Sequence, residues 1–246
     1  MDVIFSEKLK NALEPLKIRL TEEQIEAFFR FYEDLVEKNK VMNLTAITEM
    51  QEVITKHFVD SLSLVRAVPD LGNKKRKVMD LGTGAGFPGI PLAIAFPNLE
   101  LILADSLNKR ILFIEEECGK LGVRNVNAIH GRAEDLARMQ EYREQFDLCV
   151  SRAVANLSTL SEYCIPFVKE GGYFIPYKSG EIRQETENAE TALKLLGGTI
   201  EEEIRFSLPE EEGDRTLLKI RKTGPSPKKF PRKAGLPSKE PLTARK

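Results

Sequence analysis

The chain has 246 residues and a formal net charge of −1, and its length suits one sizeable folded domain. Hydrophobic residues make up 41% and charged residues 30%, which excludes a wholly disordered protein. No apolar run approaches the roughly 18–20 residues that span a bilayer. The first residues also lack the basic start and apolar stretch of a signal peptide. We therefore expect a cytoplasmic protein with no membrane partner.

The cysteine and histidine content argues against a disulfide framework and against a metal site. Cys118, Cys149 and Cys164 are odd in number and widely spaced, whereas disulfide and zinc sites use paired or clustered ligands. We expect three buried apolar thiols. Of the two histidines, His130 lies inside a strand pattern, where core packing is expected.

Residues 1–68 are predicted to form an N-terminal helical segment that packs on the core. Thr21 and Gln24 have the spacing of a capping box. Apolar residues then recur at helical spacing: Ile25, Phe28, Phe29, Tyr32, Leu35 and Val36. A further helical stretch over residues 53–65 is ended by Pro69.

Residues 69–222 are predicted to form an α/β domain. Short apolar runs that read as strands occupy residues 78–81, 99–104, 126–130, 146–150, 173–176, 199–207 and 216–221. Helices are expected between the early runs, at 90–95 and 107–121. Alternating strands and helices imply a mostly parallel sheet with helices on both faces. Ligands of such sheets bind beyond the carboxyl ends of the strands.

Residues 223–246 are predicted to form a basic, Pro-rich tail. The tail contains seven Lys or Arg and one Glu, a net charge of +6, so the rest of the chain carries −7. Its five prolines favour an extended backbone rather than a helix. A basic tail suggests an anionic partner such as RNA, although a solvated terminus that binds nothing has the same composition.

A glycine loop follows the first predicted strand in the pattern D-x-G-x-G-x-G, with Asp80 inside the strand and glycines at 82, 84 and 86. Glycine permits a positive φ and close approach of the backbone to a ligand. The dinucleotide fingerprint G-x-G-x-x-G is not met because Phe87 takes its third glycine position, and the P-loop pattern is absent. The loop resembles motif I of class I S-adenosylmethionine-dependent methyltransferases, while a tight turn without a ligand stays an alternative.

Two further segments strengthen a nucleoside-binding prediction. The second strand ends at Asp105, 23 residues past Gly82, where a carboxylate can accept hydrogen bonds from both ribose hydroxyls. The close turn at Gly84 suits contact with the same ligand. In the class I resemblance, the segment after the third strand contacts adenine, and here that segment is 131–134.

Nearly the whole chain resembles one family, the ribosomal RNA small subunit methyltransferase G family, also called the glucose-inhibited division protein B family. The resemblance rests on the order and spacing of several segments, namely 43–45 (NLT), 57–62 (HFVDSL), 80–92 (DLGTGAGFPGIPL), 109–110 (KR), 131–134 (GRAE), 151–155 (SRAVA), 231–232 (PR) and 237–242 (PSKEPL). One departure from the family pattern is Ser179, which is inserted between Lys178 and Gly180.

The resemblance implies methyl transfer from S-adenosylmethionine, without a metal, to N7 of a guanine in 16S ribosomal RNA. It implies cofactor contacts at Gly82, Phe87, Ala133, Glu134 and Arg152, to which the residues themselves add Asp105 and Gly84. Guanine N7 already carries a lone pair, so no acid or base is assigned. Catalysis is expected to come from positioning and electrostatics.

Four residues are candidates for positioning the substrate. Arg152 follows the fourth strand, and Lys178 ends the fifth. Arg132 and His57 complete the set. Three of them have a plainer alternative: Arg152 as a surface arginine paired with a carboxylate, Arg132 as a residue at a helix start, and His57 as a structural histidine.

The expected partner is 16S ribosomal RNA or the small ribosomal subunit, bound by a monomer without an obligate protein partner. A basic surface for RNA is expected from residues 74–77, Arg124, Arg132, Lys178 and the tail. The alternatives are a methyltransferase of another acceptor and an assembly factor that binds nucleoside or RNA without catalysis.

Overall fold

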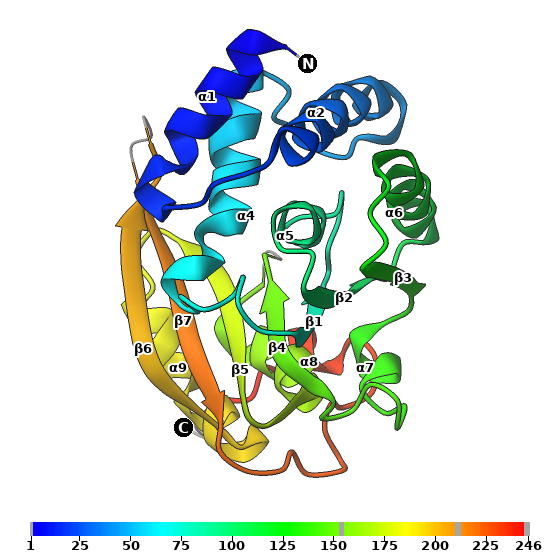
Figure 1. The fold of residues 1–246 in the computed structure, drawn as a ribbon. Helices are drawn as coiled ribbons and strands as arrows, with labels where there is room; N and C mark the ends of the chain where they lie inside the picture. The colour runs from blue at the N-terminus through cyan, green and yellow to red at the C-terminus, as the bar shows by residue number, and fades with distance from the viewer. Residues whose placement is uncertain (1, 153–154, 210–212, 244–246) are drawn as a thin grey trace.

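The centre of the protein is a seven-stranded sheet in the order β3-β2-β1-β4-β5-β7-β6 (Figure 1). The computed structural model describes residues 2–152, 155–209 and 213–243. The strands are β1 (Arg76–Leu81), β2 (Leu99–Asp105), β3 (Val126–His130), β4 (Phe146–Ser151), β5 (Val168–Ser179), β6 (Gly198–Ser207) and β7 (Asp214–Lys222). Strands β1 to β5 pair in parallel, and β7 lies antiparallel between β5 and β6. The predicted mostly parallel sheet is confirmed.

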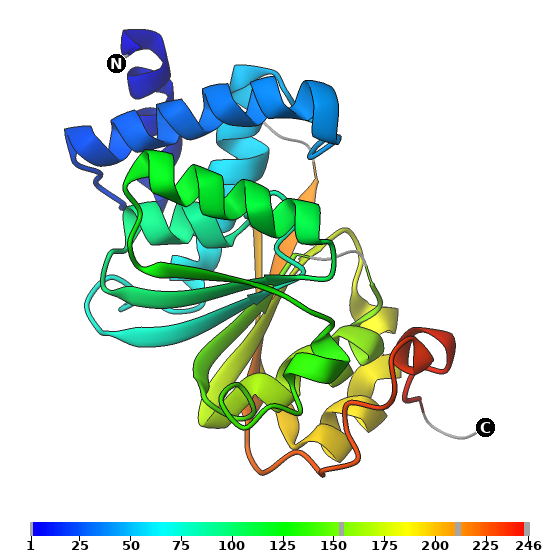
Figure 2. The same ribbon diagram turned by 90° about the vertical axis from the view of Figure 1, so that its right-hand side faces the viewer.

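Helices cover both faces of this sheet (Figure 2). The α-helices are α1 (Val3–Leu13), α2 (Glu22–Met42), α3 (Met50–Glu52), α4 (Asp60–Leu62), α5 (Gly89–Ala95), α6 (Asn108–Leu121), α7 (Ala133–Leu136), α8 (Leu157–Cys164), α9 (Arg183–Leu196) and α10 (Leu236–Lys239). The 3₁₀ segments are η1 (Glu14–Leu16), η3 (Ser63–Arg66) and η4 (Ile165–Phe167), while η2 (Val53–Val59) is a π-helix. Among the described residues, no helix has both the length and the apolar character needed to cross a membrane.

The start of α2 forms as its sequence predicts. The Thr21 hydroxyl accepts from the Gln24 N–H, and the Gln24 side chain accepts from the Thr21 N–H, so two otherwise unpaired amide groups are satisfied. The Gln24 side-chain amide also donates to the Ile94 carbonyl at 2.8 Å. One residue therefore caps α2 and ties it to α5.

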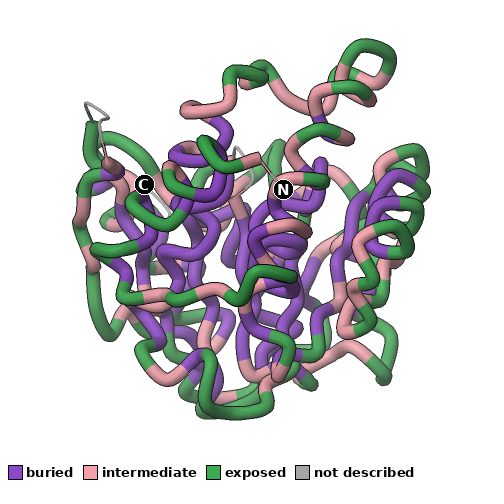
Figure 3. Tube along the Cα trace, turned by 45° about the horizontal axis from the view of Figure 1, so that its top comes forward, coloured by how far each residue is buried: buried purple, intermediate pink, exposed green. Residues whose placement is uncertain are grey.

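The N-terminal helices share a core with the sheet. Phe5, Phe28 and Phe31 are fully buried in the same apolar cluster as Leu101 and Leu103 of β2. In Figure 3 the buried positions gather between the sheet and its helices, and the exposed ones lie outside. The division at residue 68 stays a proposal about the sequence.

A second apolar cluster lies on the other face of the sheet, under α8 and α9. It includes Cys149 and Cys164, and Phe230 of the tail packs into it. All three cysteines are buried thiols, as predicted. His130, by contrast, is exposed, and its Nε2 lies 3.1 Å from the Ser106 carbonyl oxygen. The expectation that His130 packs in the core was wrong, because β3 is an edge strand whose ends reach solvent.

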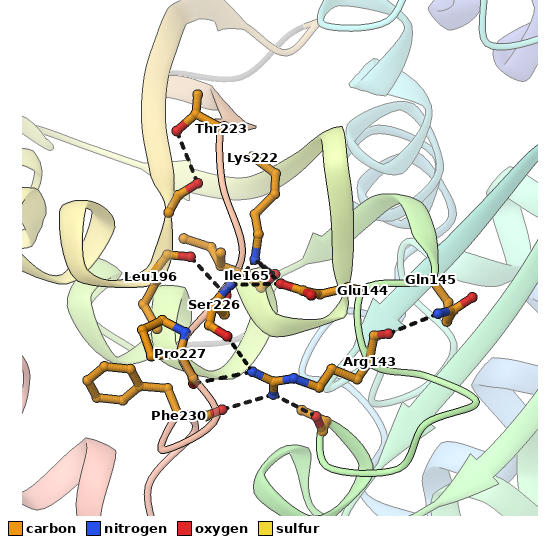
Figure 4. Close-up of polar contacts among 12 residues, drawn as sticks. Arg143, Glu144, Gln145, Ile165, Leu196, Lys222, Thr223, Ser226, Pro227 and Phe230 are labelled. Atoms are coloured by element: carbon orange, nitrogen blue, oxygen red, sulfur yellow. Dashed lines mark hydrogen bonds and ion pairs between the residues drawn. The ribbon is translucent and has the colours of Figure 1, made fainter.

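The described part of the tail is docked rather than loose. The Arg143 guanidinium donates to the carbonyls of Ser226, Pro227 and Phe230 (Figure 4). Glu144 accepts the N–H of Ser226 at 2.7 Å. Body side chains thus satisfy the backbone groups of an extended segment that has no sheet partner there.

The far part of the tail is anchored by a buried ion pair. Glu162 of α8 is 0% exposed and accepts four hydrogen bonds from three groups of Arg232: Nε, which donates to both oxygens, Nη2 and the backbone N–H. Past this point the chain turns through α10, so the expectation of an entirely extended tail was wrong. Glycine at 235, with a φ of +79°, lets the chain enter that single helical turn.

Replacing Arg232 with Met should lower the free energy of unfolding by about 3 kcal/mol, because it leaves the Glu162 carboxylate buried without its partner. Arg183→Met is the matched control, since Arg183 and Glu187 form an exposed pair on one helix, which contributes at most about 0.5 kcal/mol. Urea unfolding of both variants measures the difference. Equal losses would contradict the anchoring role of the buried pair.

Candidate functional site

The glycine loop between β1 and α5 is held in a conformation that side chains rarely adopt. Gly82, Gly84 and Gly86 have φ values of +73°, +63° and +91°. A Cβ at Gly86 would collide with the Ile90 side chain, whereas a Cβ at Gly84 would meet nothing within 4 Å. Gly86 is therefore required for packing of the loop on α5, and the space beside Gly84 is open.

Asp80 stabilises this loop through hydrogen bonds from its buried side chain. The side chain is 0% exposed, and its Oδ2 accepts from the Thr83 hydroxyl at 2.6 Å and from the Gly89 N–H at 2.8 Å. Burial raises the pKa of Asp80 to about 7, and the two hydrogen bonds limit the rise. The acid of the sequence pattern therefore joins the strand, the loop and the first turn of α5.

Asp105 lies at the carboxyl end of β2, beside the loop. Its Oδ2 accepts from the Gly84 N–H at 3.0 Å and from Arg110 at 3.2 Å, and its Oδ1 accepts from the Leu107 N–H at 2.9 Å. A carboxylate offers about four acceptor positions. Asp105 therefore orients the loop, and its three hydrogen bonds leave about one acceptor position on the carboxylate.

Arg152, at the carboxyl end of β4, joins the sheet to the N-terminal helices. Its Nη1 donates to Asp60 Oδ2 at 2.9 Å and to the Lys56 carbonyl at 3.0 Å. Its guanidinium carbon lies 5.2 Å from the ring centre of Phe87, a cation–π distance. The π-helical turn η2 brings the Lys56 carbonyl and the Asp60 side chain to the same guanidinium, and such turns are frequent at functional sites.

His57 forms a cluster with Phe87 and Arg152, and these neighbours determine its protonation state. Its ring stacks on Phe87 with centroids 4.4 Å apart. Its Nδ1 lies 3.2 Å from Nη2 of Arg152, which can only donate, so Nδ1 accepts and Nε2 donates to the Thr45 hydroxyl at 2.8 Å. Burial, and then the charge of Arg152, lowers the pKa of His57 to about 3. The imidazole is neutral and fixed in one tautomer.

A cavity of about 500 Å³ opens beside Arg152 at the carboxyl ends of β4 and β5. Lys178 lies in its wall and donates to Glu185 at 2.6 Å and to the Ala155 carbonyl at 2.7 Å. Among the described residues, the lining is Asp60, Arg152, Ala155, Asn156, Tyr177, Lys178, Ser179, Glu185 and Arg215. Lys178 therefore shares a cavity with Arg152 despite the inserted serine.

The segment after β3, residues 131–134, does not line the cavity beside Arg152. Ala133 begins α7, and Glu134 is buried, with its Oε1 accepting the Gly235 N–H of the tail at 2.9 Å. Arg132 is exposed at the N-cap of α7. The tail thus reaches one of the residues expected at the cofactor, and this contact has no signal in the sequence.

The structure brings together His57, Phe87, Arg152 and Lys178, but it separates the residues expected to form one basic surface. Residues 74–77 lead into β1, and Arg124 precedes β3, so both lie at the amino ends of the strands. Lys178 lies at the carboxyl end of β5. Ala153 and Val154, part of one family segment, lie outside the described residues, as do residues 244–246 of the tail.

Sequence reasoning missed several residues of the site: Thr45, Asp60, Tyr177 and Arg215. Asp60 belongs to the 57–62 segment and follows His57 by three residues, a spacing that puts two side chains on one helical face. That spacing was the available signal. Among the described residues, no group of three or more His, Cys, Asp or Glu side chains lies together as a metal site.

A glycine loop after β1, an acid at the carboxyl end of β2 and an antiparallel seventh strand define the class I methyltransferase fold. The crystal structure of MtNAS in complex with MTA and tNA has a similar fold, with a TM-score of 0.53, 15% sequence identity, and coverage of 81% of this chain and 71% of that one. This likeness concerns the fold alone.

Sequence comparison places the chain within that class. The family model described as rRNA small subunit methyltransferase G matches residues 24–212. The Ribosomal RNA small subunit methyltransferase G of Lachnoclostridium phytofermentans is 52% identical over 95% of this chain and 96% of that protein. Its counterpart from Alkaliphilus oremlandii is 48% identical over 95% and 97%. The chain belongs to the rRNA small subunit methyltransferase G family, and the predicted family and enzyme class are confirmed.

The low pKa of His57 has a measurable effect on stability. An imidazole in the unfolded chain has a pKa of about 6.5. Below that pH, His57 is therefore protonated in the unfolded state but stays neutral in the folded state. Stability is therefore lost as the pH falls through 6.5, and the loss stops growing below about 3. We expect His57 to account for a loss of about 2 kcal/mol between pH 7 and pH 5.

Urea unfolding of wild type and His57→Gln at the two pH values tests this. The variant should lose about 2 kcal/mol less than the wild type on acidification, because glutamine does not titrate. Equal losses would mean that His57 protonates in the folded protein.

Proposed function

We propose that the protein transfers a methyl group from S-adenosylmethionine to N7 of a specific guanine in 16S ribosomal RNA. The observation that carries the proposal is the open space beside Gly84, on the same loop that contributes Phe87 to its cluster with His57 and Arg152. Membership of the rRNA small subunit methyltransferase G family supports both the donor and the acceptor.

The residues around the glycine loop suit this cofactor. We propose that Gly82 and Gly84 present backbone to it and that Asp105 accepts from its ribose hydroxyls. Ala133 and Glu134, at the start of α7, are proposed to contact its adenine. Phe87 and Arg152 are proposed to bound the opposite end; the aromatic ring is buried, and the guanidinium is fixed by Asp60.

The bound cofactor supplies an electrophilic methyl group on a sulfonium. Guanine N7 has a free lone pair, so the protein has no proton to remove before attack. His57 matches this requirement, since it is neutral and both of its ring nitrogens are engaged. The contribution of the protein is to hold the methyl carbon and N7 in line and to fix the charges around them.

The acceptor is proposed to enter the cavity beside Arg152 and Lys178. The acidic character of the chain outside residues 223–246 argues against tight binding to RNA at large. Selectivity would then come from the folded shape of ribosomal RNA around one splayed-out base. Arg132, exposed at the start of α7, is proposed to contact phosphate nearby.

Substituting Gly84 with Ala should weaken cofactor binding about tenfold or more, because the new methyl group would occupy the space proposed for the cofactor. Gly122→Ala is the matched control. Gly122 has a φ of +68°, close to the +63° of Gly84, and a Cβ at either position meets nothing within 4 Å. Both variants should lose about 1–2 kcal/mol of stability from backbone strain, but only Gly84→Ala should lose affinity in titration calorimetry with S-adenosylmethionine. Unchanged affinity would show that the cofactor does not bind beside Gly84.

The activity itself is tested by transfer of labelled methyl from S-adenosylmethionine to small ribosomal subunits and to naked 16S RNA, both lacking the modification. Nucleoside analysis should recover the label as 7-methylguanosine from one site. Label in another nucleoside would show that the methyl acceptor is not N7 of guanine. Cofactor binding without label in either RNA would indicate a binding protein instead of an enzyme.

A further inference from the structure

Asp60 is a buried carboxylate with one oxygen engaged and one not. The residue is 6% exposed, and its Oδ2 accepts from Arg152 at 2.9 Å. Among the residues that the structure describes, Oδ1 accepts no hydrogen bond. Arg215 approaches it to 3.8 Å, an ion-pair distance that is too long for a hydrogen bond. A buried acceptor left in this way is costly unless a partner completes it.

Several other polar groups of the cavity beside Asp60 already have hydrogen-bond partners. Glu185 accepts from Lys178, and the Tyr177 hydroxyl donates to the Ser61 carbonyl at 2.8 Å. The Asn156 side-chain oxygen accepts the N–H of Thr159 as the cap of α8. Among the described side chains that line the cavity, Asp60 Oδ1 is the oxygen that is both buried and without a hydrogen bond, so it is the acceptor with most to gain from a ligand.

We propose that Asp60 is the residue that selects guanine, by accepting hydrogen bonds from N1–H and the 2-amino group of the target base. This inference rests on the proposed function, because it concerns the acceptor of that reaction. Adenine presents a lone pair at N1, which a carboxylate repels, whereas guanine presents two adjacent donors.

The surrounding charges fit the rest of the guanine ring. O6 is adjacent to N1, and Arg215, the cation nearest to Oδ1, can donate to it. The edge that contains N7 faces away from N1 and the 2-amino group. A base held by Asp60 would therefore keep N7 free to meet the methyl group. Arg152 and Arg215 also offset the cost of burying the negative charge of Asp60.

The test removes one donor from the base and one acceptor from the protein. The substrate is 16S RNA ligated from fragments, with either guanosine or inosine at the target site, because inosine lacks only the 2-amino group. For the wild type we expect kcat/KM to be about tenfold or more higher on guanosine, the effect of one charge-assisted hydrogen bond. For Asp60→Asn the preference should fall below about threefold, since the neutral amide loses the charge assistance.

Glu185→Gln is the matched control, because it makes the same change of charge in the wall of the same cavity. Its guanosine-to-inosine ratio should stay at the wild-type value, whatever its absolute rate. The wild-type ratio is measured without any substitution, so the test does not depend on whether Asp60→Asn folds.

Equal methylation of both RNAs by the wild type would overturn the inference while leaving the proposed function intact. An Asp60→Asn enzyme that is slower on both RNAs by the same factor would also overturn it, since Asp60 would then only position Arg152. A raised KM for S-adenosylmethionine with an unchanged ratio would assign Asp60 to the cofactor instead. Absence of methyl transfer to guanosine by the wild type would be a failure of the proposed function itself.

Discussion

The ion pair between Arg152 and Asp60 is the constraint on which the arrangement of the site depends. It joins residues 92 positions apart in the sequence, one at the end of β4 and the other in the N-terminal helices. Through the same guanidinium, Phe87 of the glycine loop and His57 of η2 are held together. A buried pair of this kind adds little net stability against an apolar alternative, but breaking one partner is expensive. Its value lies in fixing geometry: the loop, the fourth strand and the helices meet at one planar group with a fixed set of donors.

Local patterns predicted the elements well where they depend on local physics. The capping box at Thr21 and the strand over residues 126–130 were found as predicted, because the first rests on local hydrogen-bonding geometry and the second on a short apolar run. The π-helical turn η2 was not predicted, since hydrophobic spacing does not distinguish i→i+5 from i→i+4 hydrogen bonding over seven residues. The contacts of Lys56 and Asp60 with Arg152, which depend on this turn, could therefore not be predicted from the sequence either.

The candidate site was predictable to the extent that its residues follow strands. Arg152 and Lys178 were located from the strand ends, and the structure brings them to one cavity. Asp60 and Arg215 face that cavity from elements distant in sequence, so only the folded chain relates them. Cofactor and substrate roles stay predictions for every one of these residues. The role of the basic tail in binding RNA stays a prediction, and Arg232, which pairs with the buried Glu162, does not add free positive charge to it.

The docking of the tail has a consequence for the order in which the protein can mature. The backbone of Gly235 bonds to Glu134, the carbonyl of Pro237 accepts from Thr159, and the ring of Phe230 fills the second apolar cluster. During synthesis the strands and the glycine loop leave the ribosome well before these residues do. Helices α8 and α9 cover that face of the sheet, but the packing of Phe230 and the hydrogen bonds at residues 235 and 237 form only after translation has passed residue 237. This part of the core is therefore completed later than the sheet and the glycine loop.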